Sequence, residues 1–225
     1  MGLAGCGTTT SPARSAVDAS LARTEAAGSA RFVTINTVVG SATSTTIGWV
    51  DFTRSQLRLV RYDGLPSSVT AQYEVRQLGH TLYHRFILVP TKLASPGGVV
   101  GYLGLSRWDV QHTDQPVTAS IVPLGWFSGA DRVTVIGRAT VSGTGTMEYR
   151  VRVPGSTFSR AHLEPFYLYL WLDHEGRIRR ASCSEVETGL NGRRGPLQLT
   201  ISTTLSDFGA PGHVQAPPHA PTPRS

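Results

Sequence analysis

The first residue of the sequence with a definite chemical role is Cys6, which ends the tetrapeptide Leu3-Ala4-Gly5-Cys6. An apolar residue, two small residues and a cysteine have the form of a bacterial lipobox, in which the cysteine is diacylated before the preceding segment is removed. Small residues are needed because the signal peptidase binds an extended, unbranched segment beside the cysteine. We therefore predict that Cys6 is the lipid-attachment residue and becomes the first residue after cleavage.

The residues around Cys6 indicate what should precede and follow the anchor. A secretory signal needs a basic region and about 7 to 15 apolar residues, so we expect an in-frame signal segment upstream of Met1, without which Cys6 would be an ordinary cysteine. Residues 7–14 (GTTTSPAR) are small and polar, as in a tether that holds a domain away from a membrane. Residues 1–14 are thus predicted to be a lipobox remnant and a flexible tether. The protein is then expected to be extracytoplasmic, on the outer face of the cell membrane.

The other residues that could do chemistry are scattered along the chain. Only His80 and His84 fall close together among the histidines, and an i, i+4 pair in a strand lies about 13 Å apart. That separation is too large for two ligands of one metal ion. No GxSxG elbow, P-loop, HExxH or CxxC motif occurs, and acids such as Asp51, Asp131 and Asp173 stand near strand ends. We predict no catalytic residue, no metal site and no cofactor.

The composition is typical of one β-rich globular domain. The 225 residues are 40% hydrophobic and only 16% charged, and Thr, Ser, Val and Gly are abundant, which favours strands and turns. The net charge is +6, but the cations form no long run, so we predict no nucleic-acid binding. A basic surface would still favour anionic lipid headgroups. No stretch of about 18 apolar residues occurs, so the predicted membrane anchor is covalent.

The elements that must position these residues are mostly strands. Apolar residues along 15–27 follow one face of a helix that Gly28 ends. Runs rich in Val, Ile, Thr or aromatic residues, divided by turn residues, predict antiparallel strands. The predicted strands are 30–40, 44–53, 56–62, 69–77, 80–89, 131–141, 144–153, 165–172, 176–188 and 196–207. Together these elements predict one domain over residues 15–210.

Between Pro90 and Gly129 the strand pattern is lost. The spacing of four apolar residues between Pro116 and Phe127 fits one side of a short helix; they are Val117, Ile121, Leu124 and Phe127. A short helical turn is predicted at 157–163.

The last third of the chain contains a clear hairpin turn and a tail. Residues 173–176 (DHEG) end in a glycine between two strands, which predicts a hairpin. Cys183 lies in the second of these strands and is expected to pack as a small apolar side chain. Residues 211–225 are Pro-rich and are predicted to be a disordered tail.

The segment 165–172 (PFYLYLWL) differs from the other strands because it is apolar on both faces. A strand covered on both sides has this pattern, and either a helix or a bound ligand could supply the second cover. The sequence leaves both interpretations open.

Several short motifs and their order resemble a known family. The motifs are Gly48-Trp-Val-Asp-Phe52, Leu57-Arg-Leu59, Leu82-Tyr83, Trp171-Leu-Asp-His-Glu-Gly-Arg-Ile178 and Leu205-Ser-Asp-Phe-Gly209. With the lipobox and the short helix, they are similar to the actinobacterial LppX/LprG-type lipoproteins, whose relatives share the LolA-like fold. The resemblance covers most of residues 15–210. It departs from the family in the 90–130 region, where the family's central helices are not evident.

The resemblance implies a fold and a function. The fold would be α+β and mainly antiparallel β, with a curved half-barrel sheet wrapped over a few short helices. The function would be to bind lipid or lipoglycan acyl chains in an apolar cavity, for transport or chaperoning across the cell envelope. Burial of an acyl chain contributes about 0.8 kcal/mol per methylene, so apolar side chains suffice. The alternative is a non-catalytic sensor or scaffold that binds an envelope protein partner and has a filled core.

The residues predicted to face the cavity are the large apolar residues of the strands. They are Phe32, Ile47, Trp49, Leu57, Leu59, Tyr73, Val75, Phe86, Phe166, Leu168 and Leu170. A shift of one residue in any strand would move its residues to the other face.

Overall fold

A computed structural model of the chain describes residues 11–38, 43–65, 68–88, 107–121, 123–124, 126–127, 129–154, 166–188, 196–218 and 220. Its elements are α1 (Pro12–Ala26), β1 (Ser29–Val38), β2 (Thr43–Asp51), β3 (Gln56–Leu65), β4 (Ser68–Leu78), β5 (Thr81–Leu88), β6 (Asp109–His112), the 3₁₀ helix η1 (Val117–Ser120), β7 (Arg132–Val141), β8 (Thr144–Val153), β9 (Phe166–Leu172), β10 (Ile178–Thr188) and β11 (Pro196–Ser206).

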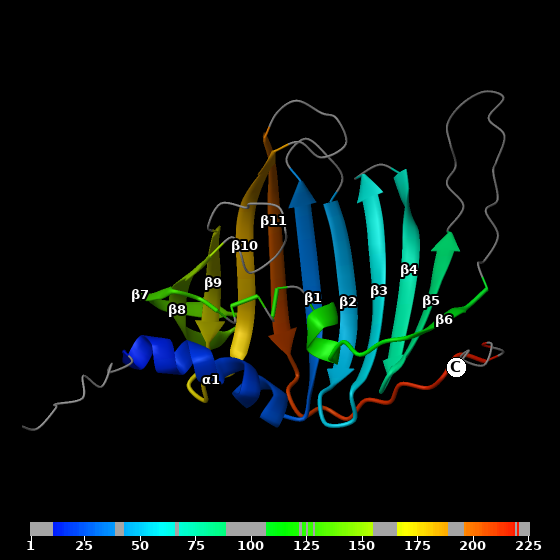
Figure 1. Ribbon diagram of the computed structural model, residues 1–225, viewed down its shortest axis with the longest axis horizontal. Helices are drawn as coiled ribbons and strands as arrows, with labels where there is room; N and C mark the ends of the chain where they lie inside the picture. Colours follow the sequence, from blue (N-terminus) through cyan, green and yellow to red (C-terminus); the bar gives the residue numbers. More distant parts are fainter. Residues whose placement is uncertain are drawn as a thin grey trace, which may run out of the picture.

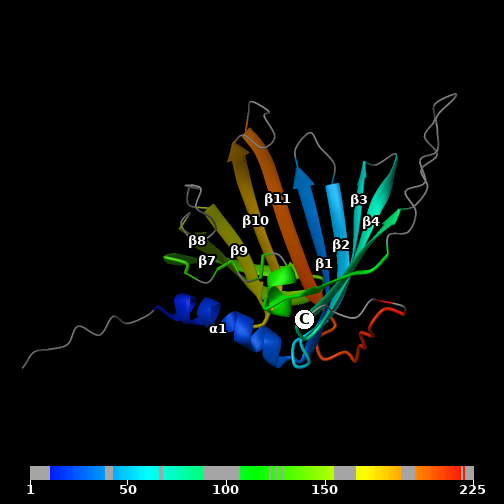
Figure 2. The same ribbon diagram turned by 45° about the vertical axis from the view of Figure 1, so that its right-hand side comes forward.

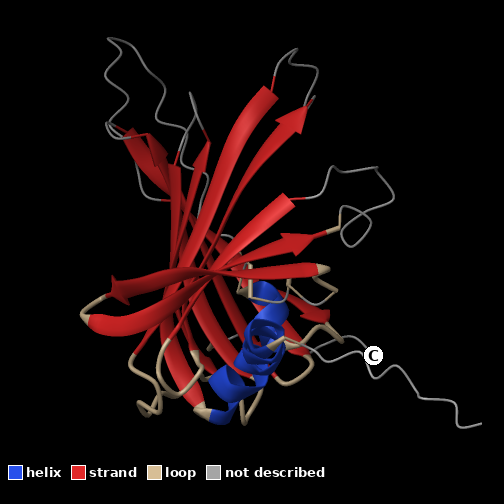
Figure 3. Cartoon of the chain, turned by 90° about the vertical axis from the view of Figure 1, so that its left-hand side faces the viewer, coloured by secondary structure: helices blue, strands red, loops and turns tan. Residues whose placement is uncertain are grey.

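All the strands belong to one antiparallel sheet with the order β6-β5-β4-β3-β2-β1-β11-β10-β9-β8-β7. Except for β6 and β7, strands that follow one another along the chain pair with each other, and the β1–β11 pair joins the two arms at the centre. The edges, β6 and β7, lie at opposite sides of the sheet, which does not close (Figure 1). The expected mainly antiparallel, curved open sheet is confirmed. The sheet is strongly twisted, and its strands fan apart (Figure 3).

The sheet has two faces of different character because successive side chains alternate along each strand. We call the inner face the one that packs on α1 and on Val117, Ile121, Leu124 and Phe127. It carries the buried residues Phe32, Leu57, Leu168 and Leu205 of the core. Figures 1 and 2 show α1 and η1 on this same side of the sheet. The opposite face is the outer face.

Helix α1 begins three residues earlier than its apolar pattern indicates, so residues 12–14 do not belong to a flexible tether. The Ser11 hydroxyl accepts a hydrogen bond from the backbone N–H of Arg14, and Pro12 occupies the first helical position, where its missing N–H has no consequence. The helix ends before Gly28, whose φ of 83° suits glycine. Thr24 fixes the helix to the sheet, because its buried Oγ1 accepts the N–H of Ile178 at 2.9 Å.

The predicted helix at 116–127 is replaced by η1 and a series of turns. Leu124 N–H donates to Ile121 O, and Trp126 N–H donates to Pro123 O, so the segment turns every three residues. Pro123 has no N–H and disfavours helical backbone in the residue before it, which explains why no longer helix forms. The apolar spacing nevertheless identified core residues, all at most 5% exposed: Val117, Ile121, Leu124 and Phe127.

Part of the C-terminal segment that the sequence predicts to be disordered packs on the outer face. Val214 is only 2% exposed. A Cβ atom at Gly212 would overlap the Trp49 indole, so the backbone passes directly over that ring. Arg76 donates from Nη1 to the carbonyl oxygen of Gln215 at 3.0 Å. Residues 211–218 are therefore held by contacts with the sheet, which composition alone does not reveal.

Candidate ligand-binding face of the sheet

The arm formed by β8, β9 and β10 is filled on its inner face by the chain itself. Nine of its inward side chains are buried at 8% exposure or less: Val151, Val153, Phe166, Leu168, Leu170, Leu172, Ile178, Ala181 and Cys183. They share one core with Ile121, Leu124 and Phe127, and the Trp126 ring meets Phe166 edge-on at 6.3 Å between centroids. In this arm the chain's own side chains occupy the position predicted for a ligand.

The predicted cavity residues do not all share a face. In β2 the inward positions are Thr46, Gly48 and Val50, because Gly48 pairs with both Phe32 and Leu59 of the inner face. Ile47 and Trp49 therefore point to the outer face, and their assignment to a cavity is wrong.

Ile47 and Trp49 face outward because Phe32 packs against Gly48 on the inner face. A Cβ atom at Gly48 would overlap the Phe32 ring and lie 2.8 Å from the carbonyl oxygen of Arg58. The Phe32 ring thus fills the space that a side chain at Gly48 would occupy. Phe32 of β1 therefore supplies the apolar surface at this position of the inner face, where β2 has none. The sequence predicted the opposite orientation, with Ile47 and Trp49 on the inner face, because they are the two largest apolar residues of β2.

The other nine predicted residues lie on the inner face and divide into two groups. Seven are core residues at 8% exposure or less: Phe32, Leu57, Leu59, Val75, Phe166, Leu168 and Leu170. Tyr73 is partly buried. Phe86 is 53% exposed although it shares the face of the core. Their role in ligand binding remains a prediction, but only these two are positioned to meet a molecule other than the chain itself.

Tyr73 and Phe86 end a row of polar and aromatic residues that crosses the inner face. The register places side by side Thr203, Thr34, Thr46, Arg61, Tyr73 and Phe86. We call these six residues the boundary row, because the next row toward α1 consists mainly of apolar core residues. Within it Thr34 and Thr203 are buried and share a hydrogen bond of 2.7 Å between their hydroxyls. The inner face therefore changes along its strands from apolar to polar.

At the β5 end of the boundary row, the Tyr73 ring packs between Phe86 and His84. Tyr73 lies 5.1 Å from Phe86 and 5.9 Å from His84, between ring centroids. His84 Nε2 lies 3.1 Å from Asp109 Oδ2 of β6. Its Nδ1 atom is buried and has no hydrogen-bond partner, which leaves an unsatisfied polar group. Burial, together with the charge of Asp109, raises the pKa of Tyr73 and keeps its hydroxyl neutral.

A second unsatisfied atom lies one row beyond the boundary row. Asn36 donates from Nδ2 to Ser44 Oγ at 3.1 Å, while its Oδ1 is buried without a partner. The inner face thus has exposed aromatic surface at Phe86 and, beneath its surface, two buried polar atoms with unused hydrogen-bonding capacity. Sequence reasoning missed His84 and Asn36, because β6, which supplies Asp109, was not predicted, and because an isolated asparagine in a strand gives no signal.

The segment that is apolar on both faces, β9, is covered differently on each side. Its inward residues belong to the core, whereas Tyr167, Tyr169 and Trp171 point to the outer face. The guanidinium of Arg150 lies 5.2 Å from the Tyr167 ring centroid, and that of Arg180 lies 5.1 Å from the Trp171 centroid. Stacked arginines therefore lie over two of these aromatic side chains, and neither a helix nor a ligand is needed to explain the pattern.

The outer face also carries an exposed apolar patch at the centre of the sheet. Val33, Ile35 and Ile47 are 39%, 45% and 50% exposed, and Val33 pairs directly with Ile47. We call these three residues the outer patch.

Two cavities in the described part of the chain lie away from the boundary row. One, of about 260 Å³, lies between the end of α1 and η1 and is lined by residues that include Glu25, Phe52 and Val117. The other, of about 480 Å³, is formed by the β7–β8 hairpin with Leu172 and Asp173. Neither contains any of the predicted cavity residues. Cys6 lies outside the described residues. No described helix has the length and apolar character to cross a membrane.

The fold is similar to solved structures of mycobacterial lipoproteins. The crystal structure of lipoprotein LppX of Mycobacterium tuberculosis gives a TM-score of 0.54 at 14% identity, over 89% of this chain and 97% of that one. LprF from Mycobacterium bovis also gives 0.54 at 14% identity, over 92% and 98%. No family model and no curated protein matched the sequence. The resemblance predicted from the motifs is confirmed at the level of the fold: this chain has the curved, open-sheet LolA-like fold of the LppX/LprG-type lipoproteins.

Proposed function

We propose that this protein is an envelope lipoprotein, anchored to the outer face of the cell membrane through acylated Cys6, that binds a lipid on the inner face of its sheet. The binding surface is the β4–β5 end of the boundary row. The lipid is carried or chaperoned there between parts of the envelope. The fold shared with two proteins described as lipoproteins supports this proposal, and no catalytic step is part of it.

The observation that carries the proposal is the exposure of Phe86. A phenylalanine on the core face of a sheet is normally covered by the chain itself, yet Phe86 is 53% exposed and contacts Tyr73. Full burial of a phenylalanine side chain contributes about 1.5–3 kcal/mol, so an acyl chain that covers the exposed half of Phe86 would contribute about half of that. The apolar part of a lipid therefore has a favourable position beside these two rings.

The polar part of a lipid also has partners on the same face. The neutral Tyr73 hydroxyl can donate a hydrogen bond, whereas the unpaired His84 Nδ1 and Asn36 Oδ1 are buried and would have to rotate toward a ligand before accepting or donating one. Arg61 stands exposed in the boundary row beside Tyr73, where its charge favours an anionic headgroup. Apolar rings next to hydrogen-bonding groups and one cation suit an amphiphile better than a hydrocarbon.

The proposal predicts that Phe86→Asp abolishes lipid binding. Native mass spectrometry of wild-type protein, purified from membranes of its host, should show adducts with lipid masses. The variant should show few or none, because an ionised carboxylate is unfavourable against an acyl chain. The matched control is Ile47→Asp, which changes a side chain of nearly equal exposure, 50%, on the outer face and should retain the adducts. Absence of lipid from the wild type, or equal loss in both variants, would contradict the proposal.

The outer patch favours a second function, that of a sensor or scaffold for a protein partner. The arm of β8 to β10 is filled, as that function requires, and three adjacent exposed apolar residues are typical of a protein interface. In this case the same two variants should behave in the opposite way. Ile47→Asp would lose a partner recovered by pull-down from host membranes, and Phe86→Asp would keep it.

A further inference from the structure

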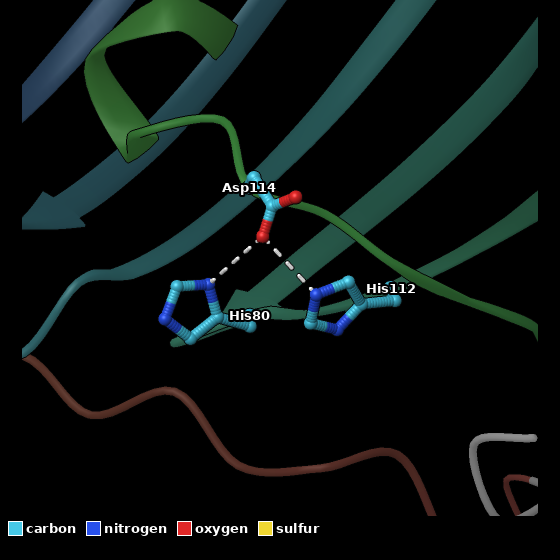
Figure 4. A group of neighbouring side chains, drawn as sticks. All are labelled: His80, His112 and Asp114. Atoms are coloured by element: carbon cyan, nitrogen blue, oxygen red, sulfur yellow. Dashed lines mark hydrogen bonds and ion pairs between the residues drawn. The ribbon is translucent and has the colours of Figure 1, made fainter. Parts of the chain in front are cut away.

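Two histidines and an aspartate converge at the end of the β5–β6 pair, away from the proposed lipid-binding surface. Figure 4 shows His80 and His112 on either side of Asp114, with a ring nitrogen of each directed at its carboxylate. His112 Nε2 lies 3.1 Å from Asp114 Oδ1, and His80 Nδ1 lies 3.9 Å from the same oxygen. One ligand atom from each residue lies within 4.8 Å of the others.

The backbone holds these three residues in place. Thr81 pairs with His112 in the β5–β6 ladder, and the N–H of Thr113 donates to His80 O at 2.9 Å. The two imidazole rings are stacked, with centroids 5.7 Å apart and planes inclined by 22°. Strand pairing thus fixes the distance between the two histidines, and only the side-chain torsions remain to be adjusted.

We propose that His80, His112 and Asp114 bind a zinc ion. Two imidazole nitrogens and one carboxylate oxygen are a common ligand set for Zn²⁺, and a water molecule completes four-coordination. Ligands about 2.0–2.1 Å from a tetrahedral zinc ion lie about 3.3 Å from one another. Small rotations of three exposed side chains reach this arrangement from the present one. Coordination through His80 Nδ1 replaces the contact that this atom makes with Thr113 O at 3.2 Å.

The zinc ion would fasten the edge of the sheet. Strand β6 has only four residues and lies at one end of the strand order, beside β5. Zinc joins the residue that precedes β5 to the last residue of β6 and to Asp114, two residues beyond it. It therefore adds a crosslink where the sheet has the fewest backbone hydrogen bonds.

The test is a titration of the whole untagged chain with ZnCl₂, measured by isothermal titration calorimetry. The wild type should bind one equivalent. His80→Asn, His112→Asn and Asp114→Asn should each weaken the binding roughly tenfold or more, because loss of even an outer partner of a ligand typically weakens metal affinity 10–100-fold. The three side chains are 67–86% exposed, so far-UV circular dichroism should show unchanged folding. MgCl₂ should give no comparable heat, since imidazole is a poor ligand for magnesium.

The matched control is His174→Asn. His174 Nε2 lies 3.7 Å from Glu175 Oε1, and its side chain is also exposed, so it provides a histidine and an acid without a second histidine. This variant should bind zinc as the wild type does. Zinc should also slow hydrogen exchange at the Thr113 amide in the wild type and in His174→Asn, but not in His112→Asn. Absence of stoichiometric binding, equal binding by all variants, or loss of binding in His174→Asn would each overturn the assignment.

Discussion

At the scale of single residues, Asp173 shows how the end of the β9 strand is held. Its side chain is fully buried. Oδ1 accepts the backbone N–H groups of Glu175 and Arg177, and Oδ2 accepts Nε of Arg177 and of Arg179 at 2.9 Å. Both guanidinium groups lie over the Phe208 ring, 4.9 and 4.6 Å from its centroid. Burial opposes ionisation of Asp173, but these hydrogen bonds outweigh it and lower the pKa of the carboxyl group.

Glu74 has a similar role on the outer face. Its buried carboxylate forms ion pairs with Arg58, Arg76 and Arg85, and the Trp108 ring lies beneath the last two guanidinium groups. Burial opposes its ionisation, yet hydrogen bonds from Arg85 and Arg76 lower its pKa. Both acids are structural and take no part in the proposed binding surface.

We predict that Asp173→Asn lowers the free energy of unfolding by about 3 kcal/mol, the lower end of the range when one partner of a buried ion pair is removed. Because the folded pKa of Asp173 lies below its unfolded value of about 3.9, the stabilisation is present above that value and is lost as pH falls through the folded pKa. Urea denaturation at neutral and acidic pH measures the effect. Glu175→Gln, at a half-exposed carboxylate, is the control and should change stability by less than about 1 kcal/mol. An equal loss in both variants would argue against this account.

At the scale of elements, runs rich in Val, Ile, Thr or aromatic residues, divided by turn residues, predicted ten strands with bounds within three residues of those found, since strand propensity and turn residues are local properties of the chain. Strand β6 was missed because it is short and mostly exposed, so it has no apolar alternation. The spacing of Val117, Ile121, Leu124 and Phe127 identified buried residues but not their backbone. A series of three-residue turns can bury the same positions as a helix.

The Phe32–Gly48 contact gives a prediction for β2. Gly48→Ala should destabilise the fold by about 1–3 kcal/mol, as overpacking of a core typically does, because the added methyl group meets the Phe32 ring and the Arg58 carbonyl. Gly145→Ala in β8 is the control, since a Cβ there has no neighbour within 4 Å, and it should change stability by about 0.5 kcal/mol or less. Chemical denaturation of both variants provides the comparison. Equal stability of Gly48→Ala and the wild type would show that Phe32 can move away.

At the scale of the whole molecule, residues 211–218 of the C-terminal segment cover the outer face at Trp49. We predict that truncation after Ala210 lowers Tm by about 2–8 °C, since loss of about 1–2 kcal/mol shifts Tm by 2–4 °C per kcal/mol in a chain of this size. The same truncation should shift tryptophan fluorescence to longer wavelength, because the Trp49 indole loses its cover at Gly212. Truncation after Pro218 retains the contacts of Val214 and Gln215 and should leave both signals unchanged. Identical melting of both truncated chains would contradict a packing role for residues 211–218.

The sequence by itself determined the antiparallel meander, most strand bounds, the hairpin at 173–176 and the resemblance to the LppX/LprG-type fold, because these depend on local alternation, turn residues and motif order. Only the tertiary structure decided that Ile47 and Trp49 face outward, that Ile121, Leu124 and Phe127 fill one arm, and that Phe86 remains exposed. It also brought His80 and His112 together. The reason is physical: which face a side chain occupies, what covers it and what lies across from it are set by pairing with strands and segments far away in the chain.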